Sequence, residues 1–359
     1  MLHLTGNSAL IVFWRRMKRF DLLVGIFLFL IPVLTACSQA TPVANEPYEK
    51  VTLKMNYALV TSYAPIIIAE VEGYFADYGI EIEKLTFNSS AEAIPLVLSG
   101  EIDVFAGAAN AGILNVLGKE ENIKVVADRG HISPDGCTFQ AIVVRKDLFE
   151  SGEITEGKDL AGHTISTPPT GPGIYFLSRY LEQEGMSLED VELTDIPTAS
   201  YIDALHNKAV DAIVTTELHL SRLMAAGDAV ILARSEDVVG DFQTSLLAFG
   251  KNLLKDNPDL GVRFMAAYLK GVEQYNEGKT ERNLATLANY THLDRDLLNQ
   301  TCWYPIAEDG YISPQPVREY MDWMYAHKKI TQKLDDDELF DMSYVKYAQG
   351  ILANTSRTG

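Results

Sequence analysis

Segments with the pattern of strands and segments with the pattern of helices alternate along most of this 359-residue chain, and this alternation limits the fold more than any other feature. In Val51–Tyr57, apolar and polar residues alternate, which is typical of a half-buried strand. The next expected elements are a helix at Pro65–Glu72, a strand at Ile80–Thr86, a helix at Ala91–Leu98 and a strand at Ile102–Ala106. Because parallel strands need a long crossover connection, usually a helix, this order predicts an α/β fold with mostly parallel sheets flanked by helices.

A helix, a tight turn, an aspartate and a buried strand occur twice in the same order. The two copies span residues 93–110 and 201–218. Placing Asp103 on Asp211 also aligns three pairs of apolar residues: Ile94 with Ile202, Val97 with Leu205, and Ile102 with Val210. Such a repeat favours two similar lobes, although any two β–α–β units share part of this pattern by coincidence.

Two apolar segments are placed to carry the chain between the lobes. Thr138–Arg145 leads from the first lobe into the second, and Thr244–Gly250 leads back. The expected organisation is a first lobe formed by residues 51–137 and 242–359 and a second lobe formed by residues 138–241. Three helices are expected after the return and should pack on the first lobe: Pro258–Asn276, Pro314–Ala326 and Ser343–Leu352.

The first residues have the pattern of an export signal. A basic cluster at Arg15–Arg19 precedes the apolar run Leu22–Val33, which at about 1.5 Å per residue is too short to cross a ~30 Å hydrocarbon core. The next residues, "LTAC", resemble the lipobox of bacterial lipoproteins, in which the cysteine is acylated; a plain signal with a chance cysteine is the alternative. We therefore expect a signal peptide at residues 1–36, a lipidated Cys37, a flexible tether over residues 37–50, and a location on the extracytoplasmic face of the cell membrane. Met17 is an alternative start.

The charge balance excludes one class of partner, and the cysteines allow one cross-link. Asp and Glu number 49 against 30 Lys and Arg, a formal net charge of −19, and such a surface repels the phosphate backbone of nucleic acids. Beyond Cys37 the chain has Cys137 and Cys302. An oxidising compartment permits a disulfide between them, and two buried thiols are the alternative.

Motifs for nucleotide binding, zinc binding and acyl transfer are absent from the sequence. In Gly171–Phe176, "GPGIYF", a phenylalanine occupies the third glycine position of a dinucleotide-binding loop, and no P-loop lysine follows. There is no His-Glu-x-x-His, no paired-cysteine motif and no Gly-x-Ser-x-Gly. The sequence predicts a protein that is not an enzyme and has no cofactor and no metal site.

The loops after the strands offer small and polar residues for a ligand. Loops at the carboxyl ends of parallel strands form the usual binding crevice of an α/β fold. Gly173 also lies at a helix start, where backbone N–H groups lack partners; a purely structural turn is the alternative. The expected ligand-binding residues are Tyr57, Ser62, Tyr63, Asn88, Ala108, Asn110, Thr167, Gly171, Gly173, Tyr175, Glu217 and Tyr304.

Three segments resemble the substrate-binding proteins of ABC importers, in particular the branch that serves thiamine-pyrimidine precursors, riboflavin and sulfonates such as taurine. They are "GYFADYGIEIE" at Gly73–Glu83, "SGEIDVFAG" at Ser99–Gly107 and "VDAIVTTEL" at Val210–Leu218. The resemblance implies the two-lobed type II periplasmic-binding-protein fold, with a ligand cleft between the lobes. It also implies a monomer whose partners are a small-molecule ligand, a membrane permease and an ATPase.

The residue before Glu217 argues against the view that this chain has the same ligand pocket as the relatives that bind thiamine pyrimidines. Relatives often have an aromatic residue there, and this chain has Thr216. A stacking ring must then come from elsewhere, with five candidates: Tyr57, Tyr63, Tyr175, Trp303 and Tyr304.

The charged residues in and near the candidate loops indicate which class of ligand is favoured. These loops contain no Lys or Arg, although Arg129 is not far from one, and Glu217 would repel a sulfonate. Tyrosines near the loops suit a flat ring. We therefore expect a neutral nitrogen heterocycle, riboflavin first and a thiamine pyrimidine second; a sulfonate held by helix N-termini is the alternative.

Two other classes of protein are alternatives to a binding protein. Eukaryotic thiamine-pyrimidine synthases have a similar two-lobed fold, but they are cytosolic enzymes with a cysteine-rich motif, which this sequence lacks. An adhesive or sensory surface lipoprotein would not need matched polar loops on both lobes. The sequence therefore favours a binding protein over both.

Overall fold

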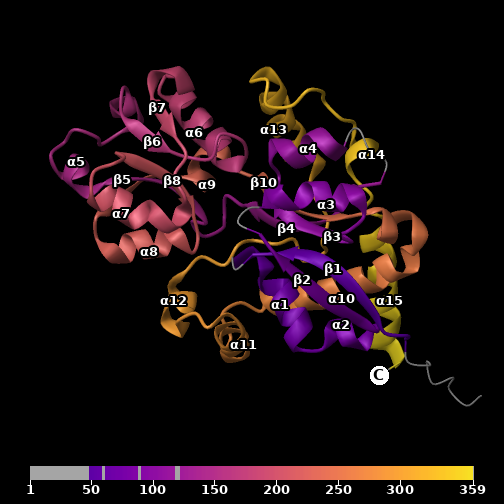
Figure 1. Cartoon of the computed structure of the whole chain (residues 1–359). Helices are drawn as coiled ribbons and strands as arrows, with labels where there is room; N and C mark the ends of the chain where they lie inside the picture. The colour runs from indigo at the N-terminus through magenta and orange to yellow at the C-terminus, as the bar shows by residue number, and fades with distance from the viewer. Residues whose placement is uncertain (1–47, 59–60, 88–89, 118–121, 359) are drawn as a thin grey trace, which may run out of the picture. The chain divides into compact units, whose positions relative to one another are not determined.

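The computed structural model describes residues 48–58, 61–87, 90–117 and 122–358. The expected signal peptide, Cys37 and most of the tether lie outside these residues, and so does Asn88. Within the described ranges, ten strands form two five-stranded sheets, each with helices on its faces (Figure 1). The expected α/β fold is therefore confirmed. No helix in these ranges has the length and apolar character needed to span a bilayer.

The first sheet combines strands from the beginning of the described chain with one from its middle, in the order β2-β1-β3-β10-β4. The strands are β1 (Val51–Tyr57), β2 (Ile80–Thr86), β3 (Val104–Ala108), β4 (Lys124–Ile132) and β10 (Phe242–Phe249). β1 pairs in parallel with β2 and β3, whereas β10 runs antiparallel between β3 and β4. Four strands therefore run one way and β10 runs against them.

The second sheet repeats this arrangement, in the order β7-β6-β8-β5-β9. The strands are β5 (Gln140–Arg145), β6 (Thr164–Ser166), β7 (Glu192–Thr194), β8 (Ala212–Thr216) and β9 (Ala229–Arg234). β6 pairs in parallel with β7 and β8, and β5 runs antiparallel between β8 and β9. Each sheet is thus mixed, with one reversed strand.

The two expected crossing strands do not themselves pass between the sheets. Residues 133–139 make the first connection, and β5 begins two residues after the expected start at Thr138. The return is made by α9 (Ser235–Val239) and its flanking residues, and β10 lies wholly in the first sheet. The expectation is wrong because β5 and β10 each lie wholly inside one sheet, antiparallel to the strands on either side. There, both edges of each strand form hydrogen bonds with a neighbouring strand.

Helices cover both faces of the first sheet (Figure 1). One face packs against α1, α2, α10 and α15, and the other against α3, α4 and α13. Their bounds are α1 (Ala64–Val71), α2 (Tyr74–Asp77), α3 (Ile94–Ser99), α4 (Ala111–Leu117), α10 (Pro258–Asn276), α13 (Pro314–Ala326) and α15 (Ser343–Thr358). The remaining helices of this part are α11 (Glu281–Thr291), α12 (Arg295–Gln300) and α14 (Asp336–Leu339).

The second sheet is covered in the same way. α6 (Pro172–Gln183) packs on one face, and α7 (Tyr201–His206) and α8 (His219–Ala226) pack on the other. A short helix, α5 (Lys146–Glu150), directly follows β5. In both sheets, successive residues of a strand face opposite sides and so pack into different apolar clusters. In β10 of the first sheet, for example, Leu246 and Ala248 belong to the cluster on one face, and Leu247 and Phe249 belong to the cluster on the other face.

The two aspartates aligned by the sequence repeat occupy equivalent places in the two sheets. The Lys54 N–H donates to Asp103 Oδ2 (2.8 Å), and the Asp103 N–H donates to the Lys54 carbonyl (2.9 Å). In the second sheet, the Thr164 N–H donates to Asp211 Oδ2 (3.0 Å), and the Asp211 N–H donates to the Thr164 carbonyl (2.9 Å). Each aspartate therefore fixes the start of a central strand, β3 or β8. β3 begins at Val104, two residues after the expected Ile102.

The later helices follow the sequence closely. α10 and α13 begin and end at the expected residues, while α15 continues to Thr358, beyond the expected end at Leu352. The helix expected at Ala91 begins as a 3₁₀ turn at Ser90–Ala93 and becomes α-helical only at Ile94. Proline at the second position of α3 suits a helix start, because its missing N–H would have no partner there.

Candidate functional site

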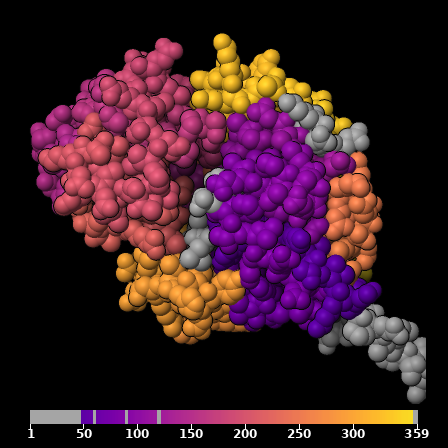
Figure 2. All heavy atoms as spheres, viewed as in Figure 1, coloured from indigo at the N-terminus to yellow at the C-terminus, as the bar shows by residue number. Residues whose placement is uncertain are grey.

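A cavity of about 370 Å³ is lined by residues from both sheets, within the size range of small-molecule pockets. It lies where the carboxyl ends of β3 and β8 meet the amino ends of the reversed strands β10 and β5, since Ser245 pairs with Ala108 and Gln140 pairs with Thr216. In the space-filling view, the magenta-to-pink atoms of the second lobe's residues meet the purple atoms of the earlier part of the chain along one boundary (Figure 2). Both sheets therefore contribute walls to one site.

Six of the twelve expected ligand-binding residues line this cavity: Ser62, Tyr63, Ala108, Gly173, Glu217 and Tyr304. Five others are described but are not part of the lining: Tyr57, Asn110, Thr167, Gly171 and Tyr175. The twelfth, Asn88, lies outside the described residues.

The five residues away from the cavity have other surroundings. The Tyr175 ring packs among Phe242, Tyr320 and Trp323, with ring centroids 4.8–5.3 Å apart, so it belongs to the core. Asn110 Oδ1 accepts from the Ile113 N–H at the start of α4. Gly171 has a φ of 136° and turns the chain into α6, which is the structural alternative weighed for this loop. Tyr57 packs edge-on against Tyr63, and Thr167 Oγ1 is buried without a partner.

Sequence reasoning missed several lining residues, among them Arg129, Phe139, Gln140, Tyr201, Thr244 and Ser245. Four of these lie at or just before the amino ends of β5 and β10. The rule that ligands bind at carboxyl ends of parallel strands does not include them, because a reversed strand brings its amino end to the same edge. No local pattern of the sequence marks the two reversed strands, so no sequence signal identified these residues.

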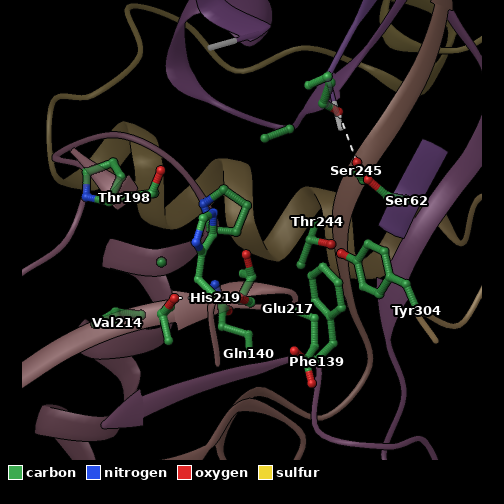
Figure 3. Close-up of a pocket in the computed structure, with 18 of the residues that line it drawn as sticks. Ser62, Phe139, Gln140, Thr198, Val214, Glu217, His219, Thr244, Ser245 and Tyr304 are labelled. Carbon is green, nitrogen blue, oxygen red and sulfur yellow. Dashed lines mark hydrogen bonds between the residues drawn. The ribbon is translucent and has the colours of Figure 1, made fainter. Parts of the chain in front are cut away.

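A pair of stacked rings forms one wall of the cavity (Figure 3). Phe139 and Tyr304 lie with their centroids 3.6 Å apart and their planes at 11°. A disulfide joins Cys137 and Cys302, each two residues before one of these rings. Gly130 makes room for the pair, because a Cβ there would lie 2.1 Å from Tyr304 Cε1. Burial raises the pKa of Tyr304 well above its usual value, so its unpartnered hydroxyl keeps its proton.

A buried cation lines the same cavity. The Arg129 side chain, from β4, donates through Nη1 to Ser62 Oγ (2.8 Å) and through Nη2 to Ser245 Oγ, and its guanidinium lies 4.5 Å from the centre of the Tyr63 ring. The sequence argument that the candidate loops lack Lys and Arg therefore does not hold for the site as a whole. It fails because Arg129 comes from a strand and not from a loop.

Glu217 connects the second sheet to the segment that carries Tyr304. Its carboxylate accepts hydrogen bonds from the Ser221 N–H (3.1 Å), the Ser221 hydroxyl (2.9 Å) and the Cys302 N–H (3.2 Å). Burial raises the pKa of this carboxyl, against the lowering effect of these hydrogen bonds. Both carboxylate oxygens are thus already engaged by the protein.

Glu217→Ala should lower the free energy of unfolding by about 1–3 kcal/mol, because it leaves the buried N–H of Cys302 and the partly buried N–H of Ser221 without acceptors. Urea unfolding followed by circular dichroism measures this change. Glu308→Ala, at an exposed position of the same segment, is the control and should change the value by no more than about 0.5 kcal/mol. Equal stabilities of the two variants would contradict the assigned linking role.

Several known proteins resemble this chain, and three of them are described below. The riboflavin-binding protein RibY of Chloroflexus aurantiacus is 25% identical over 71% of this chain and 74% of its own length. The alkanesulfonate-binding protein SsuA of Xanthomonas axonopodis, solved with MOPS, has a TM-score of 0.65 at 17% identity, over 79% of this chain and 96% of that chain. The desulfurization enzyme DszB also shares the fold, with a TM-score of 0.64 at 14% identity, over 84% of this chain and all of that chain.

These likenesses confirm the expected fold class, the two-lobed α/β fold of type II periplasmic binding proteins. The proteins that resemble the chain are mostly binding proteins, and DszB is an enzyme on the same fold. Residues 60–278, more than half of the sequence, match the NMT1/THI5-like family. The chain therefore belongs to the NMT1/THI5-like family.

Proposed function

We propose that this chain is the substrate-binding component of an ABC import system, which captures a small flat nitrogen heterocycle and delivers it to a membrane permease. Riboflavin is the first candidate ligand and a thiamine pyrimidine is the second. Residues 51–137 with 242–359 form one lobe, residues 138–241 form the other, and the ligand lies between them without being changed chemically. The observation that carries this proposal is a cavity lined from both sheets, with Phe139 and Tyr304 as a stacked wall.

The chemistry of the lining supports a flat ligand. Phe139 and Tyr304 form one aromatic wall, and Tyr63 and Tyr201 add two further rings to the lining. Stacking on such rings adds about 0.5–1.5 kcal/mol beyond the burial of apolar area. Among the described lining residues the one carboxylate is that of Glu217, and it accepts hydrogen bonds from protein donors, so its oxygens are not free to act as a base. The relative RibY, named as a riboflavin-binding protein, supports riboflavin as the first compound to test.

A sulfonate is the second candidate class, because one specific observation favours it. Arg129 supplies a buried positive charge to the cavity, and guanidinium groups bind oxyanions through charge-assisted hydrogen bonds. SsuA, whose structure contains the sulfonate MOPS, has the same fold. At 17% identity this likeness extends to the fold alone, so the choice between the two classes rests on binding experiments.

Riboflavin should raise the melting temperature of the purified chain, since a ligand that binds only the folded state adds about 2.7 kcal/mol of stability at one hundred times its Kd. Thermal melting with riboflavin, a thiamine pyrimidine, taurine and MOPS measures the ranking, and ribitol, which lacks the ring, is the negative control. Phe139→Leu should weaken riboflavin binding several-fold, whereas Tyr347→Leu, 60% exposed and remote from the cavity lining, should not. A shift with taurine and none with riboflavin would reverse the ranking.

The proposal includes a lipid anchor at Cys37 that holds the chain at the extracytoplasmic face of the cell membrane. It rests on the basic cluster, the short apolar run and the "LTAC" motif. A single acyl chain binds membranes only marginally, so firm anchoring needs more than one chain. Cys37→Ala should abolish incorporation of a labelled fatty acid and release the chain from the membrane fraction. Continued labelling of this variant would refute the anchor.

A further inference from the structure

We infer that Arg129 is a specificity-determining residue, which binds an electron-rich oxygen group of the ligand. The inference rests on the proposed function, because it concerns the same cavity, and it adds a chemical requirement that the fold does not impose. Arg129 is only 3% exposed, it belongs to β4, and it lines the cavity beside Ser62 and Ser245, which lie near each other in Figure 3. A guanidinium stays charged in proteins, so burying one is costly unless a partner compensates the charge.

The partners of Arg129 within the protein are neutral. They are two serine hydroxyls and the face of the Tyr63 ring. None of the ion pairs that the structure gives for the described residues includes Arg129. A buried charge that has no opposite charge beside it destabilises the fold, so the position has a stability cost that a bound ligand can offset.

The adjacent carboxylate, Asp128, is fully engaged elsewhere. Its Oδ1 accepts from the Gly130 N–H (2.7 Å) and Gln243 Nε2 (2.8 Å), and its Oδ2 accepts from the Ala307 N–H (2.8 Å) and pairs with His131 Nδ1 (2.8 Å). Asp128 and Arg129 therefore have different hydrogen-bond partners. The charge of Arg129 is therefore left for the cavity.

Unsatisfied donors point to the kind of group that binds there. Arg129 Nε and the Tyr304 hydroxyl are buried and have no hydrogen-bond partner, and both residues line the cavity. Both can donate, and a guanidinium donates only. Their common acceptor is an oxygen with negative or partly negative charge. A ring carbonyl of a heterocycle and an oxyanion of an acid both provide such an oxygen, so the two candidate ligand classes share this contact.

Gln140 Oε1 supplies the complementary group. It is also buried without a partner, it lines the same cavity, and it comes from β5 of the second sheet. An amide oxygen accepts hydrogen bonds only, so the ligand should also carry an N–H or O–H group. The preferred ligand thus has an oxygen acceptor for Arg129 and a donor for Gln140. Riboflavin has both groups, taurine has both through its sulfonate and its ammonium, and an unsubstituted alkanesulfonate lacks the donor.

Arg129→Met separates this role from a purely structural one. We expect its melting temperature without ligand to stay within about 2 °C of wild type or to rise, because an uncompensated buried charge is removed. The affinity for the compound that shifts the wild-type chain should fall at least about tenfold, with partial recovery in Arg129→Lys. Arg145→Met is the matched control: Arg145 is also buried but pairs with Asp147 and Asp211, so this variant should melt lower and keep its ligand affinity.

The outcomes distinguish the inference from the proposed function. If Arg129→Met melts as low as Arg145→Met, or binds the ligand as tightly as wild type, the inference is overturned. If no compound of the panel shifts the wild-type chain, the proposed ligands fail, while the ligand-free melting temperatures still decide whether Arg129 is structural. Sodium chloride titration separates the two sources of the oxygen: affinity for an oxyanion should fall with salt, and affinity for a ring carbonyl should change little.

Discussion

Replacing both Cys137 and Cys302 by alanine should lower the free energy of unfolding by about 2–5 kcal/mol. The disulfide joins residues separated by 165 positions, so its loss frees a long loop in the unfolded chain and increases the entropy of that state. It also ties the connection before β5 to the segment that carries Tyr304. We therefore expect ligand affinity to fall as well, because the stacked Phe139–Tyr304 wall loses its covalent support.

Guanidinium unfolding, with and without a reducing agent, tests this prediction. The reduced wild-type chain should unfold at the same denaturant concentration as the double variant, and the double variant should not respond to the reducing agent. The variant supplies its own control, since any effect of the reductant on it would arise from something other than this disulfide. Identical midpoints for oxidised and reduced wild type would contradict the prediction.

Gly130→Ala should lower the free energy of unfolding by about 3–5 kcal/mol and abolish ligand binding. An added Cβ would lie 2.1 Å, 2.2 Å and 2.9 Å from three ring atoms of Tyr304, so the ring would have to leave its place against Phe139. The position also has a φ of 146°, which alanine adopts only with strain. Chemical unfolding and ligand-induced melting shifts measure the two effects.

Gly171→Ala separates backbone strain from steric overlap. Gly171 has a similar φ of 136°, but a Cβ there would meet only Asn110 Cβ at 3.8 Å, an ordinary contact. This variant should lose about 1–3 kcal/mol of unfolding free energy through strain alone. The excess loss in Gly130→Ala is then the cost of displacing Tyr304. Equal losses in the two variants would show that the ring moves freely, and the described wall would be wrong.

The parts of this protein that were predictable from sequence are those with a local signal. Alternating polarity gave β1 and β2 residue for residue, and helical spacing with proline starts gave α10 and α13. The aligned aspartates Asp103 and Asp211 identified two equivalent strand starts, one in each sheet. Each of these features depends on residues close together along the chain, which is why a one-dimensional pattern contains them.

The composition of the cavity follows from contacts between distant segments. Sequence reasoning placed Ser62, Gly173 and Glu217 at the site, because they follow strands whose carboxyl ends were predictable. It found no Lys or Arg in the candidate loops, with Arg129 only nearby, and it expected Tyr175 among the ligand-binding residues, whereas Arg129 lines the cavity and Tyr175 lies in the core. Arg129 was not among the expected residues because it belongs to a strand, β4, and not to a loop, and Tyr175 packs among rings from distant parts of the chain. The lining residues near the amino ends of β5 and β10 were missed because these strands are reversed, and no local pattern distinguishes a reversed strand from a parallel one.

By itself, the sequence determined that the chain alternates strands and helices, repeats one unit and belongs with two-lobed α/β proteins. Only the tertiary structure decided that the amino ends of β5 and β10 join the carboxyl ends of β3 and β8 at one edge. It also brought Cys137 to Cys302 and stacked Phe139 on Tyr304 across more than 160 residues of chain. Strand direction and such pairings are set by which arrangement buries the most apolar surface and satisfies the most backbone groups, a property of the whole fold and not of any segment.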